Sequence, residues 1–311
     1  MAILVAADFS PAEWAAWWPA LQAALPGERL LRDRSEAPAD QIEIALVANA
    51  PAGSLRDLPR LLLVQSLWAG VERLLADPDL PPAVPIARMV DPALAEAMAQ
   101  TALWAVLGLQ RDFFAYASQQ RERRWAQYPQ RRADEVRVGV LGLGEMGRVC
   151  ARRLAANGYP VTGWSRRPGG EPGFATASGD AALAGVLGAS DIVINLLPLT
   201  PATRALFNAA NLARLPRGAS LVNLARGAHV VDADLLEALD GGHLSHAVLD
   251  VFHTEPLAVE HPFWTHPRVT VLPHIAAQTD PRSAVQVVAR NVAALRAGRA
   301  IEHAVDRSRG Y

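Results

Sequence analysis

The hydrophobic residues of this chain fall into short continuous runs that alternate with helically spaced stripes. Early in the sequence, apolar runs at residues 3–6, 44–48, 61–65 and 85–89 are each bounded by polar or turn residues, which is typical of buried strands. Residues 11–25 place tryptophan and leucine at helical spacing, which favours a helix packed on a core. This alternation predicts a small α/β unit with a mostly parallel sheet.

The same alternation continues through the rest of the chain. A helical pattern over residues 91–112 leads out of the first unit. Six further apolar runs then predict six strands, at residues 138–141, 160–164, 192–196, 219–224, 247–251 and 269–272. The last helical pattern, residues 280–297, has no later strand to pair with, so we expect it to return to the first unit. We therefore predict one domain from residues 1–94 and 284–311, and a second domain from residues 95–283.

Residues 113–132 break this alternation. The segment is rich in arginine and glutamine and also contains Tyr116, Trp125 and Tyr128. It is too polar for a core and too aromatic for a free loop, so we expect an arm that packs on a neighbouring subunit.

The apolar run at residues 138–141 ends in the sequence GLGEMG, which is followed by a helical pattern and another strand. A strand, a Gly-x-Gly-x-x-Gly turn, a helix and a strand occur here in the order that a dinucleotide site requires. Gly142 permits a tight turn, Gly144 lets the backbone approach a pyrophosphate, and Gly147 lets the helix pack close to the strand. The first N–H groups of the helix then face the phosphates. The predicted cofactor contacts of this turn are Gly142, Leu143, Gly144, Glu145, Met146 and Gly147.

Composition agrees with a globular protein of two domains and removes several function classes. The chain has 311 residues, 51% of them hydrophobic and 20% charged, and its formal net charge is −1, so we expect no nucleic-acid partner. It contains no lysine, which excludes a P-loop lysine, a Schiff base and the Tyr-x-x-x-Lys pair of short-chain dehydrogenases. Together with the glycine turn, this predicts an α/β fold, a Rossmann-type doubly wound parallel sheet with a second, smaller flavodoxin-like α/β domain.

Two further observations bear on surroundings and metals. The start of the chain lacks a basic segment, and its longest charge-free apolar stretch, residues 97–110, is too short to span a bilayer. We therefore expect a cytoplasmic protein without a membrane partner. The histidines show no metal-ligand spacing, so no metal is predicted, and Cys150 lies on the apolar side of its helix.

The choice of cofactor depends on the end of the second strand after the turn. Folds that bind NAD have an Asp or Glu there, about 20 residues past the glycines, to bind the ribose. This chain instead has Trp164, Ser165, Arg166 and Arg167, which offer a hydroxyl and two guanidinium groups. A 2′-phosphate would gain charge-assisted hydrogen bonds from these groups. The four residues are predicted cofactor contacts that prefer NADP(H), with NAD(H) possible.

Ionisable residues follow three strands at the edge where ligands of open α/β sheets bind. Arg226 follows the strand at 219–224, Glu255 follows the strand at 247–251, and His274 follows the strand at 269–272. An arginine can bind a carboxylate and polarise a carbonyl, and a histidine can donate a proton to a forming alkoxide. A carboxylate beside that histidine would hold its tautomer and raise its pKa. This trio suits hydride transfer from NADPH to a small 2-keto acid, giving a 2-hydroxy acid.

These motifs resemble the D-2-hydroxyacid dehydrogenase family and, within it, the glyoxylate/hydroxypyruvate reductases of the A type. The resemblance covers nearly the whole chain, and its pieces are GLGEMG, NLLPLTPATR, LVNLARGAHVVDADLLEAL, LDVFHTEPL, FWTHPRVTVLPHIAAQT and VDRSRGY. It implies catalytic roles for Arg226, Glu255 and His274 and formation of the D-hydroxy acid. It also implies a homodimer built on the cofactor domain, which fits the arm at residues 113–132.

The resemblance implies further contacts with ligands. Cofactor contacts outside the glycine turn would come from Leu196, Leu197, Pro198, Thr203, Ala225, Asp250 and Ala276. The turn after the strand at 61–65 is similar to the family's substrate loop, with Trp68, Ala69 and Gly70 next to the substrate carboxylate. That loop commonly has a small residue where Trp68 stands, so an indole here either narrows the pocket or turns away from it.

Two other interpretations compete with this one. The GLGEMG turn followed by W-S-R-R also resembles the β-hydroxyacid dehydrogenases, but that family begins with its nucleotide fold and needs a catalytic lysine, which this chain lacks. The second is a nucleotide-sensing protein of the same fold without catalytic activity. The complete set of Arg226, Glu255 and His274 argues against a sensor.

Overall fold

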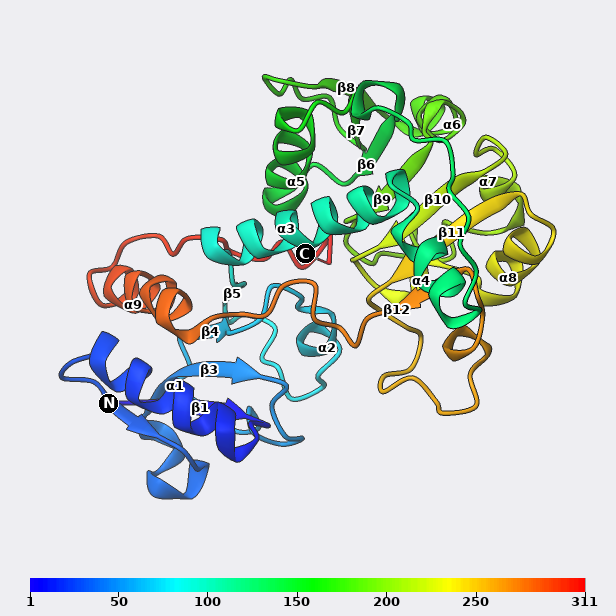
Figure 1. Cartoon of the computed structure of the whole chain (residues 1–311). Coiled ribbons are helices and arrows are strands. Elements are labelled where there is room, and N and C mark those ends of the chain that lie inside the picture. The colour runs from blue at the N-terminus through cyan, green and yellow to red at the C-terminus, as the bar shows by residue number, and fades with distance from the viewer. Residues whose placement is uncertain (311) are drawn as a thin grey trace. The chain divides into compact units, whose positions relative to one another are not determined.

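The computed structural model describes residues 1–310, and contacts within the chain divide it into two compact units (Figure 1). Unit 1 consists of Met1–Ala93 and the chain from Thr279 onward, and unit 2 consists of Leu94–Gln278. The boundaries predicted from the sequence are 94/95 and 283/284. Residue 311, the last residue of the predicted first domain, lies outside the described residues.

Unit 1 is built on a five-stranded sheet in which every neighbouring pair is parallel. Its strand order is β2-β1-β3-β4-β5, the doubly wound order of flavodoxin-like folds. The strands are β1 (Ala2–Ala7), β2 (Arg29–Leu31), β3 (Ile42–Ala48), β4 (Leu63–Ser66) and β5 (Ile86–Ala87). All of β3 is buried, which explains its continuous apolar run, whereas β2 has three residues of which only Leu31 is buried. The flavodoxin-like prediction is confirmed.

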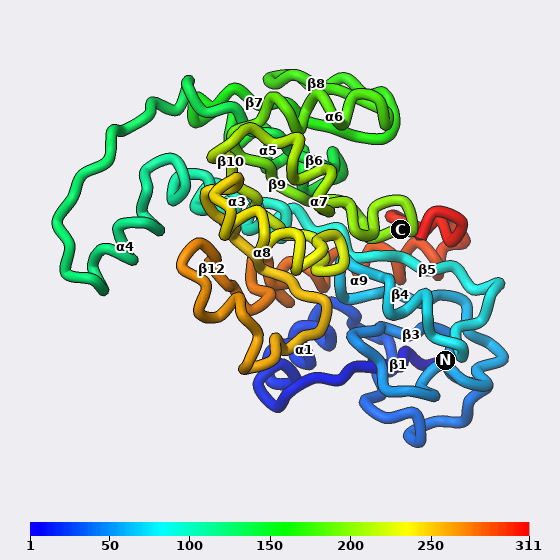
Figure 2. Tube along the Cα trace, turned by 90° about the vertical axis from the view of Figure 1, so that its right-hand side faces the viewer, coloured from blue at the N-terminus to red at the C-terminus, as the bar shows by residue number. Residues whose placement is uncertain are grey.

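The helices of unit 1 are α1 (Pro11–Ala24), α2 (Glu72–Leu75) and α9 (Pro281–Arg296), with 3₁₀ turns at Arg34–Glu36 and Ala39–Gln41. A capping box between Ser10 and Glu13 starts α1, and the side chain of Asp280 caps α9. Helices α1 and α9 pack against each other (Figure 2). The buried amide of Asn291 in α9 donates to the side-chain oxygen of Gln65 at 2.7 Å, which joins the last helix to strand β4. The last helix thus lies in unit 1.

Unit 2 is built on a seven-stranded sheet, also parallel throughout. The chain runs outward from β6 to β7 and β8 on one side, then crosses to β9 and continues through β10, β11 and β12 on the other. The Rossmann-type prediction is therefore confirmed, with a topological switch point between β6 and β9. The strands are β6 (Val138–Leu141), β7 (Val161–Ser165), β8 (Ala175–Ser178), β9 (Ile192–Asn195), β10 (Ala219–Asn223), β11 (Leu244–Leu249) and β12 (Val269–Val271).

Helices cover both faces of this sheet. The residues of a strand point alternately to the two faces, so successive residues of a buried strand are apolar. Ile192 and Ile194 pack into one core with α3 and α5, while Val193 between them packs into the other core with α6 and α8. The helices are α3 (Pro92–Gln110), α4 (Phe113–Arg121), α5 (Glu145–Ala156), α6 (Asp180–Ala189), α7 (Ala209–Leu212) and α8 (Asp232–Asp240), with 3₁₀ turns at Ala133–Glu135, Gly227–His229 and Pro262–Trp264. Burial raises the pKa of the Cys150 thiol to about 12, which agrees with a packing role for this residue.

The start of α8 differs from the common sequence pattern. An aspartate before a helical pattern is a typical N-cap, but in α8 the capping residue is Val231, and Asp232 is the first residue of the helix. The Asp232 carboxylate instead lies 3.5 Å from a ring nitrogen of both His253 and His261. Tertiary partners thus replace the local cap that the sequence pattern indicated.

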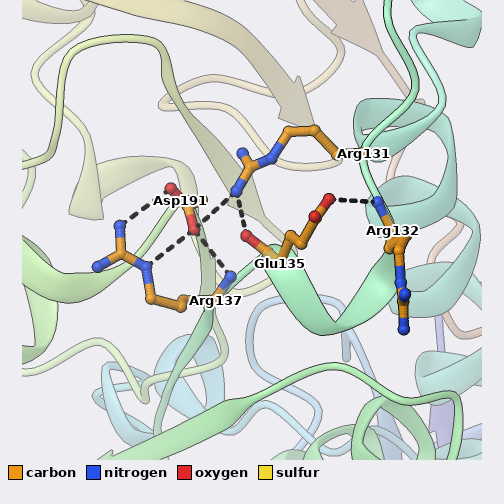
Figure 3. A network of polar contacts seen from close by, with 5 residues as sticks. All are labelled: Arg131, Arg132, Glu135, Arg137 and Asp191. Atoms are coloured by element: carbon orange, nitrogen blue, oxygen red, sulfur yellow. Dashed lines mark hydrogen bonds and ion pairs between the residues drawn. The ribbon is translucent and has the colours of Figure 1, made fainter.

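The segment after α3 forms the predicted arm. Helix α4 and residues 122–132 project from the body of unit 2 (Figure 2), and the Trp125 side chain is 95% exposed. The base of the arm is held by Asp191, which precedes β9 (Figure 3). The backbone N–H and the guanidinium of Arg137 donate to the Asp191 carboxylate at 2.8–3.1 Å, and Arg131 lies 3.4 Å away. Packing of the arm on a neighbouring subunit stays a prediction.

Two features are absent from residues 1–310. None of the helices there combines the length and the apolar character needed to cross a bilayer. The same residues contain no group of three or more His, Cys, Asp and Glu side chains that could hold a metal ion.

Candidate active site

A histidine–carboxylate pair lies beyond the ends of β11 and β12. Nδ1 of His274 is 2.7 Å from Oε2 of Glu255, and the other carboxylate oxygen accepts the backbone N–H of Phe252 at 2.9 Å. With Nδ1 directed to the carboxylate, Nε2 is the nitrogen that a ligand can use. The His274 side chain is 52% exposed, so the ring is open to small molecules.

The charges of this pair support each other. The hydrogen bond to Glu255 raises the pKa of His274, burial works in the opposite direction, and the negative charges of Glu255 and Asp250 add to the increase. Burial alone would raise the pKa of Glu255, but hydrogen bonds from His274 and from the Phe252 N–H outweigh it, so this pKa is lowered. Both shifts favour an imidazolium beside a carboxylate.

Asp250 holds the loop on which His274 lies. Asp250 is 1% exposed, and its carboxylate accepts the backbone N–H groups of Ile275 at 2.7 Å and Ala276 at 3.0 Å. Its backbone carbonyl accepts the N–H of His274 at 2.9 Å. These bonds hold His274 at φ 54°, a left-handed conformation that most side chains disfavour. The hydroxyl of Thr101 also donates to the Ala276 carbonyl at 2.7 Å. The structure therefore gives Asp250 and Ala276 a positioning role in addition to their predicted cofactor contact.

Arg226 enters this edge from the end of β10. A Cβ at the next residue, Gly227, would lie 1.9 Å from the backbone carbon of Phe252, so only glycine permits this approach. The close contact brings the loop after β10 against the loop after β11, beside the His274–Glu255 pair. The charge of Arg226 accordingly lowers the pKa of both His274 and Glu255. Its guanidinium donates to the Ala225 carbonyl at 2.6 Å.

Two buried asparagines at the ends of β9 and β10 were not identified from the sequence. Asn195 and Asn223 are both 0% exposed, and the amide of Asn195 donates to Oδ1 of Asn223 at 3.0 Å. Asn223 in turn donates to the carbonyl of Arg226 at 3.0 Å. Each asparagine is the last residue of an apolar strand, which is a weak sequence signal because many loops also begin with a polar residue. Together they fix the chain where it leaves two neighbouring strands.

The glycine turn fits a dinucleotide pyrophosphate. A Cβ at Gly147 would lie 1.7 Å from the Gly142 carbonyl oxygen, so the helix approaches the strand as closely as predicted. Gly142 has φ +100°, and a Cβ there would lie 2.8 Å from the carbonyl oxygen of Leu196. Nothing lies within 4 Å of a Cβ placed on Gly144, which is the N-cap of α5 and has no side-chain cap. The turn is thus tightly packed at Gly142 and Gly147, and it leaves space at Gly144, where phosphates would bind. The exposed Glu145 and half-buried Met146 follow on the helix, and Leu143 is buried.

The predicted contacts at the end of β7 divide into two groups. Trp164 is 3% exposed and its indole N–H donates to the Gly179 carbonyl at 3.0 Å, so its ring packs in the core, and its cofactor contact stays a prediction. Ser165 is half-buried, and its hydroxyl donates to the carbonyl of Arg167 at 2.7 Å. The side chains of Arg166 and Arg167 are exposed beside it.

The loop after β9 packs against the glycine turn. The N–H of Leu196 donates to the carbonyl of Leu141, the last residue of β6, at 2.8 Å. Leu197 is buried, and the Pro198 carbonyl accepts the hydroxyl of Thr203 at 2.7 Å. Thr203 therefore stabilises this loop from within the protein, and the cofactor contact that the family resemblance implies for it stays a prediction.

The predicted substrate loop lies in unit 1, directly after β4. Its backbone is turned by Ser66, whose hydroxyl accepts the N–H of Trp68 at 3.0 Å. The Trp68 indole packs edge-on against Phe9 and Trp17, with ring centroids 6.1 Å and 5.9 Å away. Of the two orientations expected for this indole, the structure thus shows packing into the aromatic cluster of unit 1. Ala69 and Gly70, which follow, are half-buried.

Comparison with known proteins places this site in a family. The family described as "D-isomer specific 2-hydroxyacid dehydrogenase, NAD binding domain" matches residues 103–276. A D-isomer specific 2-hydroxyacid dehydrogenase from Xanthobacter autotrophicus Py2, solved with NADPH and MES, is 42% identical, with a TM-score of 0.94 over 100% of this chain and 99% of its own. The chain belongs to the D-isomer specific 2-hydroxyacid dehydrogenase family. It is therefore an oxidoreductase, and the matched region of this dehydrogenase contains the glycine turn, Arg226, Glu255 and His274.

Two other similar structures come from rhizobia. The NADPH-dependent glyoxylate/hydroxypyruvate reductase of Sinorhizobium meliloti, in complex with NADP and sulfate, is 38% identical with a TM-score of 0.91, covering 99% of each chain. A probable 2-hydroxyacid dehydrogenase of Rhizobium etli, in complex with NADP, HEPES and tartaric acid, is 31% identical with a TM-score of 0.90, covering 100% of this chain and 99% of its own. The similarity of the dehydrogenase to these proteins extends over both units.

The Gly227 contact gives a test of how the site is held. Gly227→Ala places a methyl group where the Phe252 backbone lies, so we expect the free energy of unfolding to fall by about 1–3 kcal/mol. Gly185→Ala is the matched control, because Gly185 lies within α6 and a Cβ there meets nothing within 4 Å. The control should be neutral or stabilising by up to about 1 kcal/mol. Urea unfolding measures both, and equal stability of the two variants would contradict the close approach.

Proposed function

We propose that this dehydrogenase reduces a small 2-keto acid of the glyoxylate/hydroxypyruvate type to the D-2-hydroxy acid, with NADPH as the preferred cofactor. The observation that supports this most strongly is the His274–Glu255 pair, 2.7 Å apart, half-exposed, and at the same sheet edge as Arg226. That edge adjoins the glycine turn, because β6 and β9 are neighbours and β10 to β12 continue from β9. The glyoxylate/hydroxypyruvate reductase of Sinorhizobium meliloti, to which the chain is similar, supports the substrate class.

The residues of the chain would divide the work of binding and proton transfer. When bound, the nicotinamide supplies the hydride. Arg226 binds the substrate carboxylate through its planar guanidinium and polarises the reacting carbonyl. His274 donates a proton from Nε2 to the carbonyl oxygen as that oxygen gains negative charge. General acid catalysis of this kind contributes about 10²–10⁴-fold in rate.

Glu255 acts on the reaction through His274. Its bond to Nδ1 keeps the proton-donating nitrogen directed to the substrate and favours the charged imidazolium. Because the pKa of His274 is raised, the proton-donating form is complete at low pH and is lost as pH rises through that pKa. Reduction should therefore slow as the pH increases, and oxidation of the hydroxy acid, which needs the neutral imidazole, should become faster.

The preference for NADPH rests on the groups near the glycine turn. The open helix N-terminus at Gly144 would bind the pyrophosphate. Ser165, Arg166 and Arg167 would bind the 2′-phosphate, because residues 164–167 at the end of β7 include no acidic residue to bind a free ribose hydroxyl. The complexes of the relatives with NADPH or NADP support this choice. Contacts from Trp68, Ala69 and Gly70 to the substrate, and a homodimer formed by unit 2 and its arm, remain predictions.

His274→Asn tests the proposed activity. Asparagine tolerates the left-handed backbone at this position but cannot donate the proton, so kcat for NADPH-dependent reduction of glyoxylate should fall about 10²–10⁴-fold. Binding of NADPH, followed by its fluorescence, should change by no more than a few fold. His303→Asn is the matched control, because His303 has a similar φ of 57° and is exposed in unit 1.

Two results would contradict the proposal. Unchanged turnover in His274→Asn would remove this residue from the mechanism. A wild-type protein that binds NADPH but reduces neither glyoxylate nor hydroxypyruvate would instead favour the nucleotide-sensing alternative.

The double substitution Arg166→Ala and Arg167→Ala tests the cofactor preference. Each charge-assisted hydrogen bond to a 2′-phosphate contributes about 1.5–3 kcal/mol, so KM for NADPH should rise at least ten-fold. NADH lacks that phosphate and is the internal control, with a KM expected to change less than about three-fold. Steady-state assays with both cofactors measure this, and equal losses would rule out the phosphate role.

A further inference from the structure

A second histidine, His229, lies in the segment after β10, three residues past Arg226, and takes no part in the proposed chemistry. His229, at the end of the 3₁₀ turn Gly227–His229, is 0% exposed. Its Nδ1 is 3.1 Å from the carbonyl oxygen of Arg226, and its Nε2 is 3.3 Å from the carbonyl oxygen of Pro198. One buried ring therefore joins the segment after β10 to the segment after β9.

The ring closes a circuit of hydrogen bonds between the two segments. Asn195 accepts the N–H of Leu197 at 3.3 Å and donates to Asn223 at 3.0 Å, and Asn223 donates to the carbonyl of Arg226 at 3.0 Å. The imidazole of His229 then links that carbonyl to Pro198, which follows Leu197 in the chain. The asparagines join the two segments at the ends of the strands. The imidazole joins them again three residues further along each segment, at Pro198 and Arg226.

Both carbonyls are hydrogen-bond acceptors, so each of the two contacts needs a donor from the imidazole. A neutral ring has one N–H and can donate to only one of them, whereas an imidazolium donates to both. Each carbonyl also has a second donor, the amide of Asn223 for Arg226 and the hydroxyl of Thr203 for Pro198. Removing one of the two imidazole contacts, here called the Nδ1 arm and the Nε2 arm of His229, therefore costs about one hydrogen bond and should shift the segment that it holds. The contact with the Arg226 carbonyl positions the residue that carries the guanidinium. The contact with the Pro198 carbonyl positions the loop beside the glycine turn.

We propose that His229 is a positioning residue that sets the distance between the substrate-binding and cofactor-binding segments of the dehydrogenase. This inference rests on the proposed function. The Nδ1 arm holds Arg226 for the substrate carboxylate, and the Nε2 arm holds residues 196–198 against the cofactor. The two arms should therefore affect two different binding constants.

Asparagine and glutamine separate the arms. The amide nitrogen of asparagine is two bonds from Cβ, as Nδ1 is, and that of glutamine is three bonds from Cβ, as Nε2 is. His229→Asn thus keeps a donor for the Arg226 carbonyl, and His229→Gln keeps one for the Pro198 carbonyl. His229→Phe retains a planar ring and removes both donors.

We expect a split in the measured constants. His229→Asn should raise the dissociation constant for NADPH about ten-fold, the effect of one lost hydrogen bond, and leave KM for glyoxylate within about three-fold. His229→Gln should do the reverse, and His229→Phe should worsen both. Fluorescence titration gives the NADPH constant without turnover, and steady-state reduction of glyoxylate gives KM. His243→Asn is the control, because His243 in the same unit bonds a single backbone carbonyl, that of Leu212, at 3.1 Å.

The outcomes separate this inference from the proposed function. Equal losses in both constants for the asparagine and glutamine variants, or a lower melting temperature with neither constant changed, would overturn the positioning role. If wild-type protein reduces no 2-keto acid, the proposed function fails. In that case the NADPH constants still test the Nε2 arm, and an unchanged constant in His229→Asn would overturn it as well.

Discussion

Strands β9, β10, β11 and β12 lie side by side and parallel, so the loops that follow them must share one edge of the sheet. This constraint brings Arg226, Glu255 and His274 together although long stretches of chain separate them. The edge alone would place them only roughly, because loops are mobile and their side chains reach in several directions. Backbone contacts supply the finer placement, through the close approach at Gly227 and the three hydrogen bonds accepted by Asp250.

The chemistry of the site follows from the pairing of charges at this edge. Glu255 makes an imidazolium favourable at His274, and the positive charge of Arg226 opposes it. The two cationic groups that would meet the substrate thus share one carboxylate. A bound 2-keto acid would add a second carboxylate close to Arg226. Substrate binding and a charged proton donor then favour each other, which is what reduction of a keto acid requires.

Much of the fold and of the candidate site follows from the sequence, because both depend on patterns that are local. Buried parallel strands are continuous apolar runs, and the residues after them occupy a predictable edge. Strands β2 and β8 escaped this reasoning because they are short and largely exposed, so they have no apolar run to recognise. The sequence shows Trp164 beside two arginines, but it does not show that the indole packs into the core, because side-chain direction at the end of a strand has no local pattern.

The supporting residues were harder to find. Asn195 and Asn223 join two strand ends through a bond between their side chains, and His229 bonds the backbone of the loop after β9. No spacing in the sequence encodes such distant partners. A single polar residue at the end of an apolar strand is also what an ordinary loop start looks like. Gly227 was noticed only as part of a motif, since the clash that requires glycine involves a backbone about 25 residues further along.

The proton-donating role of His274 beside Glu255 is the central claim, and the pH dependence of kcat/KM for NADPH-dependent glyoxylate reduction tests it most directly. In the wild-type enzyme, activity should be full at low pH and fall through a pKa above the ordinary value of about 6.5. Glu255→Gln removes the charge that raises this pKa, so the fall should move to lower pH. Glu260→Gln, which alters an exposed carboxylate of the same loop, should leave the profile in place. A profile that does not move in Glu255→Gln would contradict the pairing, and a wild-type rate that rises with pH would contradict proton donation by His274.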